Sequence, residues 1–469
     1  MNISRAVISL LPIGLLLITG LSYIQPQLAS SATQKPALTL SQAPEPPAEV
    51  APEAAGTSRL ESALDQEDIA AAVQQVEQKW RLEYESYFKT QFPRRSMDIA
   101  EMSRTLARLG SQTGKKPALI YMIPAPKGLE LIVVLPNAKP IHKRITAAQR
   151  DILFPTVQNF RLAITDVGSN QADYLPNAQK LYEWLIASIE PDLQANQIDT
   201  LVFCLGSNLR TLPIAALHDG QKFLIEKYSL SIIPAFNLLD NRYRSVKWTR
   251  VLAMGASQFK QQTSLPAVPV ELSSIVGTSW PGKFFLNQNF TLENLKAQRA
   301  MQSYGIVHLA THAEFQPGIA SNSYIQFWDS RLLLDQLKDL GWQDPPVQLL
   351  VLSACRTALG DEQAELGFAG LAIQSGVKSA IASLWYVSDT GTLVLMTNLY
   401  QQLKVAPIKA EALRQTQIAM LSGKARLKNS RLAVRRGGAA LPPQLAEFVN
   451  DDLSHPYYWA AFTTIGSPW

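Results

Sequence analysis

The chain has 469 residues, a net charge of +5, and a composition that is 47% hydrophobic and 17% charged. This length and apolar content exclude a fibrous or wholly disordered protein and suffice for two or three domains with buried cores. The most obvious basic cluster, residues 423–438, has no interleaved aromatic residues to stack on bases, so we do not expect nucleic-acid binding.

The N-terminal segment 1–32 has the pattern of a signal peptide or a single membrane anchor. Ala6–Ile24 is an uncharged, mostly apolar stretch of nineteen residues, and Leu28–Ala32 offers small residues for signal cleavage. A basic residue, Arg5, precedes the stretch, and acidic residues dominate the segment after it. We therefore expect an exported or single-pass membrane-anchored protein with most of its chain outside the cytoplasm.

The next two segments predict a tether and then a helical region. Residues 33–57 are too rich in Pro, Ala and Glu to pack and are expected to form a linker. Residues 58–110 space their apolar residues at three and four, which predicts one helix over the first part and a second helix that ends at Gly110. We expect this helical pair to cover the following domain.

Residues 115–245 predict a smaller α/β subdomain, the first half of the folded region. Pro117–Pro136 is expected to form two strands joined by the turn APKG, and Gln179–Leu193 an amphipathic helix. Thr200–Leu217 is expected to be a strand with a following loop and short helix, and Cys204 lies within that strand as a core residue.

Residues 250–469 alternate strand and helix patterns, which predicts a doubly wound, mainly parallel sheet with flanking helices. The strand-like segments are RVLAMGAS, KFFLNQ, YGIVHLATHAEF, VQLLVLSACRTALG and KSAIASLW, and the aromatic end SHPYYWAAFTTIGSPW is expected to add a final strand.

Two of these strands carry residues that suit nucleophilic catalysis. The run from Tyr304 is expected to end at His312, and the run from Val347 places Cys355 just past its end. The carboxyl ends of neighbouring parallel strands meet at one sheet edge, where catalytic groups gather. A free thiol has a pKa of about 8.5 and reacts as the thiolate, which a nearby imidazolium stabilises. His308, inside its strand, is expected to be a hydrogen-bonded core histidine.

The two cysteines are too few for a disulfide framework. An oxidising compartment would favour a disulfide between Cys204 and Cys355, which would be an inactive state. We expect Cys355 to be a free thiol. No cofactor is expected, and no Cys/His spacing suits zinc.

From about Pro117 to Trp469 the chain resembles the CHAT domain family, which is related to caspases and separases. The matching segments are NLRTLPIAALHDGQKFLIEKYSLSIIPA, IVHLATHAEF, LLVLSACRTALG, ELGFAGLAIQSGVKSAIASLWYVSDTGT and HPYYWAAFTTIG. The resemblance implies a caspase-like cysteine peptidase fold, with His312 as general base and Cys355 as nucleophile. It also implies an oxyanion site formed by the backbone N–H groups of Cys355 and Ala313, where loss of one donor costs about a hundred- to a thousandfold in rate.

One departure from the family concerns Ala313, because relatives usually have glycine after the histidine. Glycine reaches left-handed backbone angles that cost other residues about 1–2 kcal/mol. If the oxyanion site needs such an angle, activity would be low.

The segment SLWYVSDT resembles a separase stretch in which an aspartate faces the basic residue before the scissile bond, and Asp389 matches that aspartate. On the sequence alone, Asp389 is equally well placed to be the N-cap of the following helix. Other charges in the matching segments are expected to be solvated or to support the fold: Arg210, Asp335, Arg356 and Glu365.

Two functional hypotheses follow. The first is an endopeptidase that cuts a protein or peptide substrate after Arg or Lys, is attached to the membrane if its N-terminal segment is uncleaved, and processes itself at Arg435/Arg436. The second is a CHAT scaffold or interaction domain with weak or no activity, gated by an activating protein partner; Ala313 motivates it.

Overall fold

The computed structural model describes residues 52–277, 279–428, 431–432 and 452–469. The predicted signal or anchor segment, most of the linker, and Arg435 and Arg436 lie outside these residues. Ala51–Trp469 form one structural unit. No helix within the described ranges has both the length and the apolar content needed to cross a bilayer.

Thirteen of the described strands form one sheet, and most of them lie along a single path. In order across the sheet these are β10 (Arg331–Leu333), β9 (Tyr324–Gln326), β8 (Ile306–Phe315), β11 (Leu349–Thr357), β12 (Ser379–Ser383), β15 (Phe462–Gly466), β5 (Ser229–Ile233), β4 (Thr200–Leu205), β1 (Pro117–Ala125), β2 (Gly128–Val134) and β3 (Ile141–Ile145). Two further strands, β6 (Val251–Gly255) and β7 (Gly282–Leu286), extend it beside the first half of β8. A separate hairpin joins β13 (Leu427–Lys428) and β14 (Arg431–Leu432).

The sheet consists of two parallel blocks that run in opposite directions. Strands β7, β6, β8, β11 and β12 are parallel to one another, and so are β15, β5, β4 and β1. The blocks meet at the antiparallel pair β12–β15, so the predicted final strand lies at the junction of the two halves. This arrangement confirms the predicted α/β class with a mainly parallel sheet.

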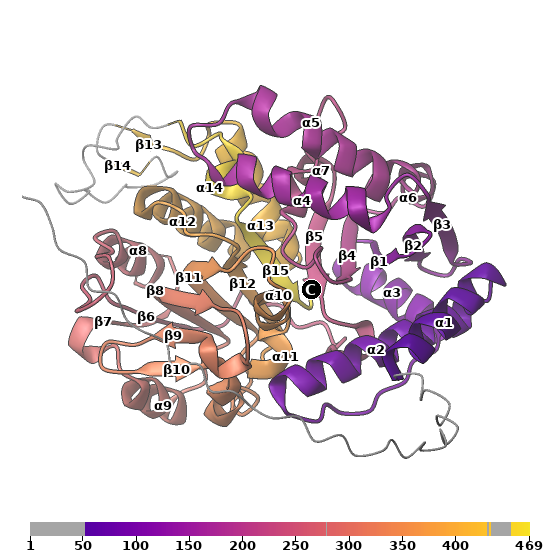
Figure 1. The fold of residues 1–469 in the computed structure, drawn as a ribbon. Helices are drawn as coiled ribbons and strands as arrows, with labels where there is room; N and C mark the ends of the chain where they lie inside the picture. Colours follow the sequence, from indigo (N-terminus) through magenta and orange to yellow (C-terminus); the bar gives the residue numbers. More distant parts are fainter. Residues whose placement is uncertain (1–51, 278, 429–430, 433–451) are drawn as a thin grey trace, which may run out of the picture. The chain divides into compact units, whose positions relative to one another are not determined.

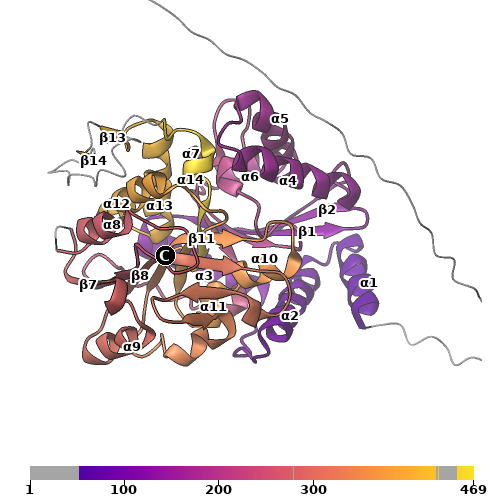
Figure 2. The same cartoon turned by 60° about the vertical axis from the view of Figure 1, so that its left-hand side comes forward.

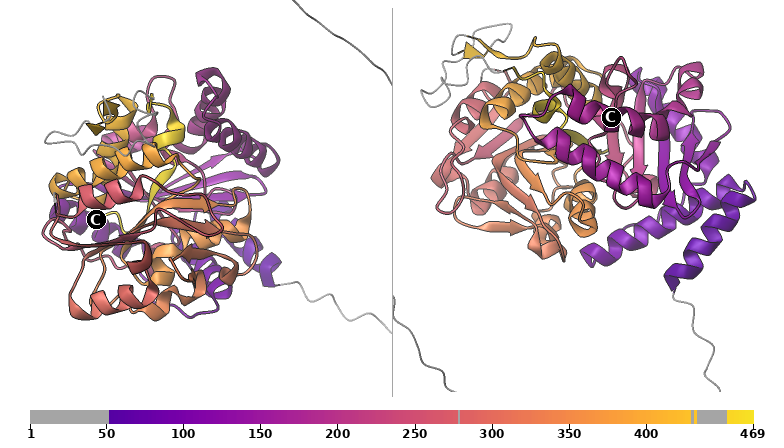
Figure 3. Two further views of the ribbon diagram at one scale, coloured as in Figure 1. Left: turned by 90° about the vertical axis from the view of Figure 1, so that its left-hand side faces the viewer. Right: turned by 45° about the horizontal axis from the view of Figure 1, so that its top comes forward.

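Helices cover both faces of the sheet. They are α1 (Pro52–Asp65), α2 (Ile69–Phe88), α3 (Ile99–Thr113), α4 (Arg150–Thr165), α5 (Gln171–Tyr182), α6 (Glu190–Ala195), α7 (Leu224–Lys227), α8 (Val268–Ile275), α9 (Leu292–Met301), α10 (Glu362–Ala369), α11 (Leu371–Ser375), α12 (Asp389–Val405), α13 (Lys409–Leu421) and α14 (Pro456–Trp459). Figure 1 shows α4, α5, α7, α12, α13 and α14 above the strands, with α1, α2, α9 and α11 below them. Figure 2 shows the same two layers from the side, and the right-hand view of Figure 3 shows α4 and α5 crossing the strands of the first half.

The strand β1 shows why both layers form. Its alternate residues Leu119 and Tyr121 belong to the core beneath α1–α3, whereas Ile120 and Met122 belong to the larger core under the opposite helices. Successive strand residues point to opposite faces, and both faces of this strand are apolar. The predicted strands β1 and β2 and the buried position of Cys204 on β4 are confirmed.

The helical boundaries differ from the predictions in three places. The first run is two helices, because the side chain of Asp68 caps α2 by accepting from Ala71 N at 3.0 Å. Helix α3 continues past Gly110 and ends at Gly114, which adopts a left-handed φ of 69°. Gln179–Leu193 is interrupted after α5 by a π-helical turn at Glu183–Ala187, before α6 begins.

Candidate active site

The structure places His312 and Cys355 on two neighbouring parallel strands, β8 and β11. Neither residue lies at a strand end as predicted, because β8 continues to Phe315 and β11 to Thr357. The two strands stay paired after an irregularity between Leu352 and Ala354. This continued pairing embeds both residues in the ladder.

The register determines how the two side chains are oriented. His312 pairs with Ala354, and Cys355 pairs with Ala313, the residue after the histidine. Paired residues of a ladder share a face of the sheet, and successive residues alternate between faces. The side chains of His312 and Cys355 are therefore directed to opposite faces, and no hydrogen bond joins these two described residues.

Cys355 is a buried, neutral thiol in this state. It has 0% exposure, and its Sγ donates to the carbonyl of Leu352 at 3.6 Å. Burial raises the pKa of the Cys355 thiol to about 12, so the thiolate is scarcely populated at neutral pH. The backbone N–H of Cys355, a predicted oxyanion donor, donates to Ser383 Oγ at 3.2 Å, and Ser383 Oγ donates to the Cys355 carbonyl at 3.1 Å.

His312 is engaged by a segment that follows β6. Its Nε2 lies 2.8 Å from the backbone carbonyl oxygen of Thr263, and because a carbonyl only accepts, Nε2 carries the proton. The ring of Phe259 meets the imidazole edge-on with centroids 4.7 Å apart, and the ring of Tyr386 stacks on it at 6.1 Å. Burial lowers the pKa of His312, which favours the neutral imidazole.

Ala313 has an ordinary extended backbone. It pairs with Cys355 on one side and with Ile325 of β9 on the other, and it is not among the non-glycine residues with positive φ. The absence of glycine therefore causes no strain in this conformation.

Asp389 is the first residue of α12, but it does not cap that helix. The cap is Ser388, whose Oγ accepts from Gly391 N at 3.2 Å. The Asp389 carboxylate instead accepts from the N–H of Ala267 at 3.0 Å. Burial raises the pKa of Asp389 to about 6, and within the described ranges it forms no ion pair with a lysine or arginine.

We call residues 257–267 the covering loop, because this one segment contacts both His312 and Asp389. Phe259 and Thr263 engage His312, and Ala267 engages Asp389. Beside the loop is an open cavity of about 530 Å³, lined by Gln258, Phe259, Lys260, Gln261, Gln262, Gln326, Trp328, Asp329, Ser330 and Arg331. Our sequence reasoning did not identify this loop; the only available signal was its position directly after a predicted strand end.

His308 is confirmed as a hydrogen-bonded core histidine. It is fully buried, with Nε2 2.7 Å from Oε1 of Glu271 on α8 and Nδ1 3.2 Å from the hydroxyl of Tyr400 on α12. These bonds join β8 to the two helices that cover it. Sequence reasoning found the histidine but neither partner.

The charges expected to support the fold include two that are deeply buried. Glu365 on α10 binds Arg161 of α4 at 2.9 Å and the hydroxyl of Thr211 at 2.7 Å. Arg210 pairs with Glu83 at 2.7 Å and lies over the ring of Tyr84. The Glu365 cluster joins α4 to α10 of the second half, whereas the Arg210 cluster joins α2 to the segment after β4. Neither touches His312 or Cys355.

The CHAT domain family matches residues 175–467, and the chain belongs to this family. The structure is similar to separase in the Saccharomyces cerevisiae separase–securin complex, at 9% identity and a TM-score of 0.45, covering 90% of this chain. This chain spans only 34% of that separase chain. It is also similar to the pro- and mature-domain complex of Porphyromonas gingivalis RgpB, at 11% identity and a TM-score of 0.36, covering 67% of this chain and 75% of that one. No curated protein matches the sequence.

Proposed function

We propose that this CHAT protein is a cysteine endopeptidase whose described conformation is latent. The observation that carries the proposal is the pairing of β8 with β11, which brings the backbones of His312 and Cys355 to adjacent positions. His312 would be the general base and Cys355 the nucleophile that forms a thioester with the substrate carbonyl. Membership in the CHAT family supports the same roles.

Activation requires a defined set of changes. The end of β11 must rotate so that the Cys355 thiol leaves its apolar site and reaches the face on which His312 lies. His312 must also present a nitrogen with a free lone pair to the thiol: Nδ1 has one in the present tautomer, whereas Nε2 has one only after it releases the Thr263 carbonyl. Finally, Ser383 must release the N–H of Cys355 if that group is to bind an oxyanion. An activating protein partner that displaces the covering loop would favour these changes.

Asp389 is our candidate for selecting a basic residue before the scissile bond. Its carboxylate is half-buried, and its one hydrogen bond among the described residues is to the N–H of Ala267. An arginine or lysine side chain of the substrate could replace that bond and would stabilise the ionised form, whose formation burial now disfavours. Removing one partner of such a buried charged pair costs about 2–5 kcal/mol.

The proposal is tested by covalent labelling with an acyloxymethyl-ketone peptide that ends in arginine. Labelling of the full chain should disappear in Cys355→Ala and His312→Ala and weaken in Asp389→Asn. Cys204→Ala is the matched control, because it removes the other buried thiol. Equal labelling of Cys355→Ala and the wild type would contradict the assignment.

A second variant tests latency. Ala267→Pro removes the N–H that binds Asp389, and a proline after Pro266 also disfavours the turn in which Val268 N donates to the Leu265 carbonyl, so the variant loosens the covering loop. If the covering loop restrains the site, this variant should be labelled severalfold faster than the wild type. An unchanged rate would show that the loop is not the restraint.

The alternative is a scaffold or interaction domain without peptidase activity. The buried Cys355 thiol and its bonded N–H favour this second candidate. It predicts no labelling of wild type or Ala267→Pro at any probe concentration, with normal folding of both. His312-dependent labelling of Cys355 in either protein excludes it.

We also propose that residues 1–32 export or anchor the chain, with the folded region outside the cytoplasm. The support is the apolar stretch Ala6–Ile24 and the charge distribution around it. A reporter enzyme that is active only outside the cytoplasm, fused after Trp469, would test this; an inactive reporter on a fusion protein that is produced at full length would contradict it.

A further inference from the structure

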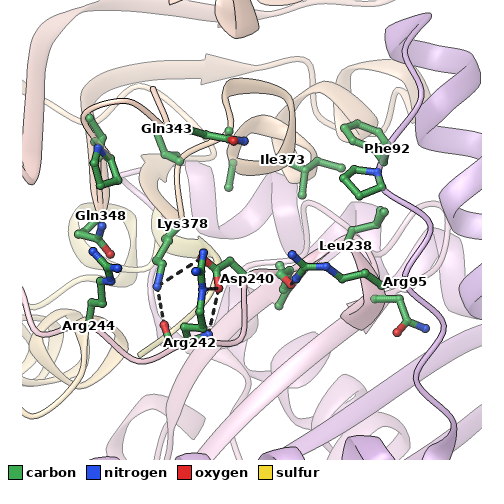
Figure 4. Close-up of a pocket in the computed structure, with 18 residues that line it drawn as sticks. Phe92, Arg95, Leu238, Asp240, Arg242, Arg244, Gln343, Gln348, Ile373 and Lys378 are labelled. Carbon is green, nitrogen blue, oxygen red and sulfur yellow. Dashed lines mark hydrogen bonds and ion pairs between the residues drawn. The ribbon is translucent and has the colours of Figure 1, made fainter. Parts of the chain in front are cut away.

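A basic cavity lies at the opposite ends of the strands from Cys355. It has a volume of about 420 Å³ and forms where β11 and β12 begin, next to the segments that follow α2 and β5 (Figure 4). Val347 and Gln348 precede β11, and Gly376 and Lys378 precede β12. The cavity is thus separate from the candidate active site, although it contacts the strands that carry Cys355 and Ser383.

The cavity contains more positive than negative charge. Arg95, Arg242, Arg244 and Lys378 line it, and the only carboxylate among its lining residues is Asp240. Asp240 is shared: Arg242 binds both of its oxygens, at 2.8 and 2.7 Å, and Lys378 Nζ lies 3.5 Å from Oδ2.

The cations of the cavity differ in their surroundings: Lys378 has a largely buried side chain and also donates to the carbonyl of Arg242, whereas Arg242 and Arg244 are exposed to solvent. Lys378 has a side chain that is 9% exposed, and its pKa is lowered first by burial, with Arg242 and Arg244 adding to the effect. Among the described residues, no hydrogen-bond or ion-pair partner is found for the Arg244 side chain. A buried cation surrounded by excess positive charge is stabilised by an anion, and a concave site strengthens that attraction.

The remaining walls indicate what else the ligand contains. Phe92, Leu238 and Ile373 supply apolar surface, and Figure 4 shows Phe92 and Ile373 on the side opposite Arg242 and Lys378. Gln348 is 7% exposed, and its buried Oε1 has no hydrogen-bond partner among the described residues; Figure 4 shows this side chain beside Arg244, at the other end of the cavity from Phe92. Small-molecule sites of about 300–1,000 Å³ combine apolar walls with a few polar groups in this way.

We propose that this cavity binds a nucleoside di- or triphosphate. The phosphates would contact Arg242, Arg244 and Lys378, and the base would lie against Phe92 and Ile373. Four cationic side chains against one carboxylate leave a net charge of about +3, which complements a diphosphate better than a monophosphate.

The test is calorimetric titration of the full chain at low salt with ADP, GDP, pyrophosphate and adenosine. We expect one nucleoside diphosphate to bind with one-to-one stoichiometry and at least tenfold more tightly than pyrophosphate or adenosine. Arg244→Glu should weaken that binding at least tenfold, and Phe92→Ala should weaken nucleotide binding but not pyrophosphate binding. Arg104→Glu, at an exposed position on α3, is the charge-matched control and should have no effect.

Three outcomes would overturn the proposal. These are no nucleotide binding at millimolar concentration, equal affinity for pyrophosphate and the nucleotides, and equal weakening by Arg244→Glu and Arg104→Glu. Equal affinity for pyrophosphate would indicate an adventitious ion only. Thermal unfolding of each variant without ligand separates a lost site from a lost fold.

Discussion

The backbone carbonyl of Thr263 lies 2.8 Å from Nε2 of His312. The covering loop therefore accepts a hydrogen bond from the nitrogen that carries the proton of the candidate general base. The same loop holds Asp389 through the N–H of Ala267. These contacts engage both residues in the absence of substrate. They make the covering loop the first place to test how the site is controlled.

We predict that Cys355 is protected from small thiol reagents in the native chain. Its exposure is 0%, and its pKa is raised to about 12, so it presents neither surface nor thiolate to iodoacetamide. Intact mass should show almost no modification in buffer and two modified thiols in denaturant, because Cys204 is also free and buried. Rapid modification of Cys355 under native conditions would show that the exposed conformation is already populated.

Phe259→Ala should raise the pKa of His312 toward the ordinary value of about 6.5. Burial is the main cause of its lowered pKa, and the Phe259 ring is one of the groups that bury it. The titration can be followed by NMR of the imidazole protons. His455 is the internal control: its pKa is also lowered mainly by burial, and its contacts, Ser169 and Tyr174, belong to the N-terminal half of the folded chain.

Asp389→Asn should make stability less dependent on pH between about 4 and 6. The pKa of Asp389 is raised to about 6 in the folded chain from 3.8, so the wild type loses stability as pH rises through that window, by about 3 kcal/mol. Asparagine stays neutral and can still accept from Ala267 N. The variant should therefore gain stability relative to wild type above pH 6, measured by denaturant unfolding.

The comparison between pH 4 and pH 7 decides that prediction. If the difference in free energy of unfolding between Asp389→Asn and the wild type is the same at both pH values, burial does not penalise the ionisation of Asp389.

Glu365→Ala should destabilise the chain by about 3–5 kcal/mol, because it leaves the Arg161 guanidinium buried without its carboxylate. The Arg161 and Glu365 side chains are 5% and 0% exposed, so solvent cannot replace the lost partner. Gln363→Ala, an exposed position on the same helix, is the matched control and should change stability little. A loss below about 1 kcal/mol for Glu365→Ala would show that the pair is not needed.

The sequence predicted the fold class and most of the strands. Apolar runs such as Thr200–Leu205 and Leu349–Leu352 are long enough, and sufficiently β-branched or leucine-rich, to form strands buried on both faces. The matching segments also predicted the CHAT family. These features depend on the local composition and the order of residues, and both can be read from a single sequence.

Helix boundaries were predicted less well. The break at Asp68 and the continuation of α3 to Thr113 depend on which side chain caps which N–H group. The short strand β9 was missed because its three residues, Tyr324–Gln326, are too few to show a pattern and form a strand through pairing with β8 and β10.

The sequence alone therefore predicted that His312 and Cys355 belong to neighbouring strands of a mainly parallel sheet, and the pairing of β8 with β11 confirms it. Only the tertiary structure showed that their side chains are directed to opposite faces of the sheet. Side-chain direction depends on the strand register, and a single irregularity in the pairing changes that register. It also decided what the covering loop contacts and where the basic cavity forms, since both depend on segments distant in the chain. Such contacts arise from packing, which no local pattern of residues specifies.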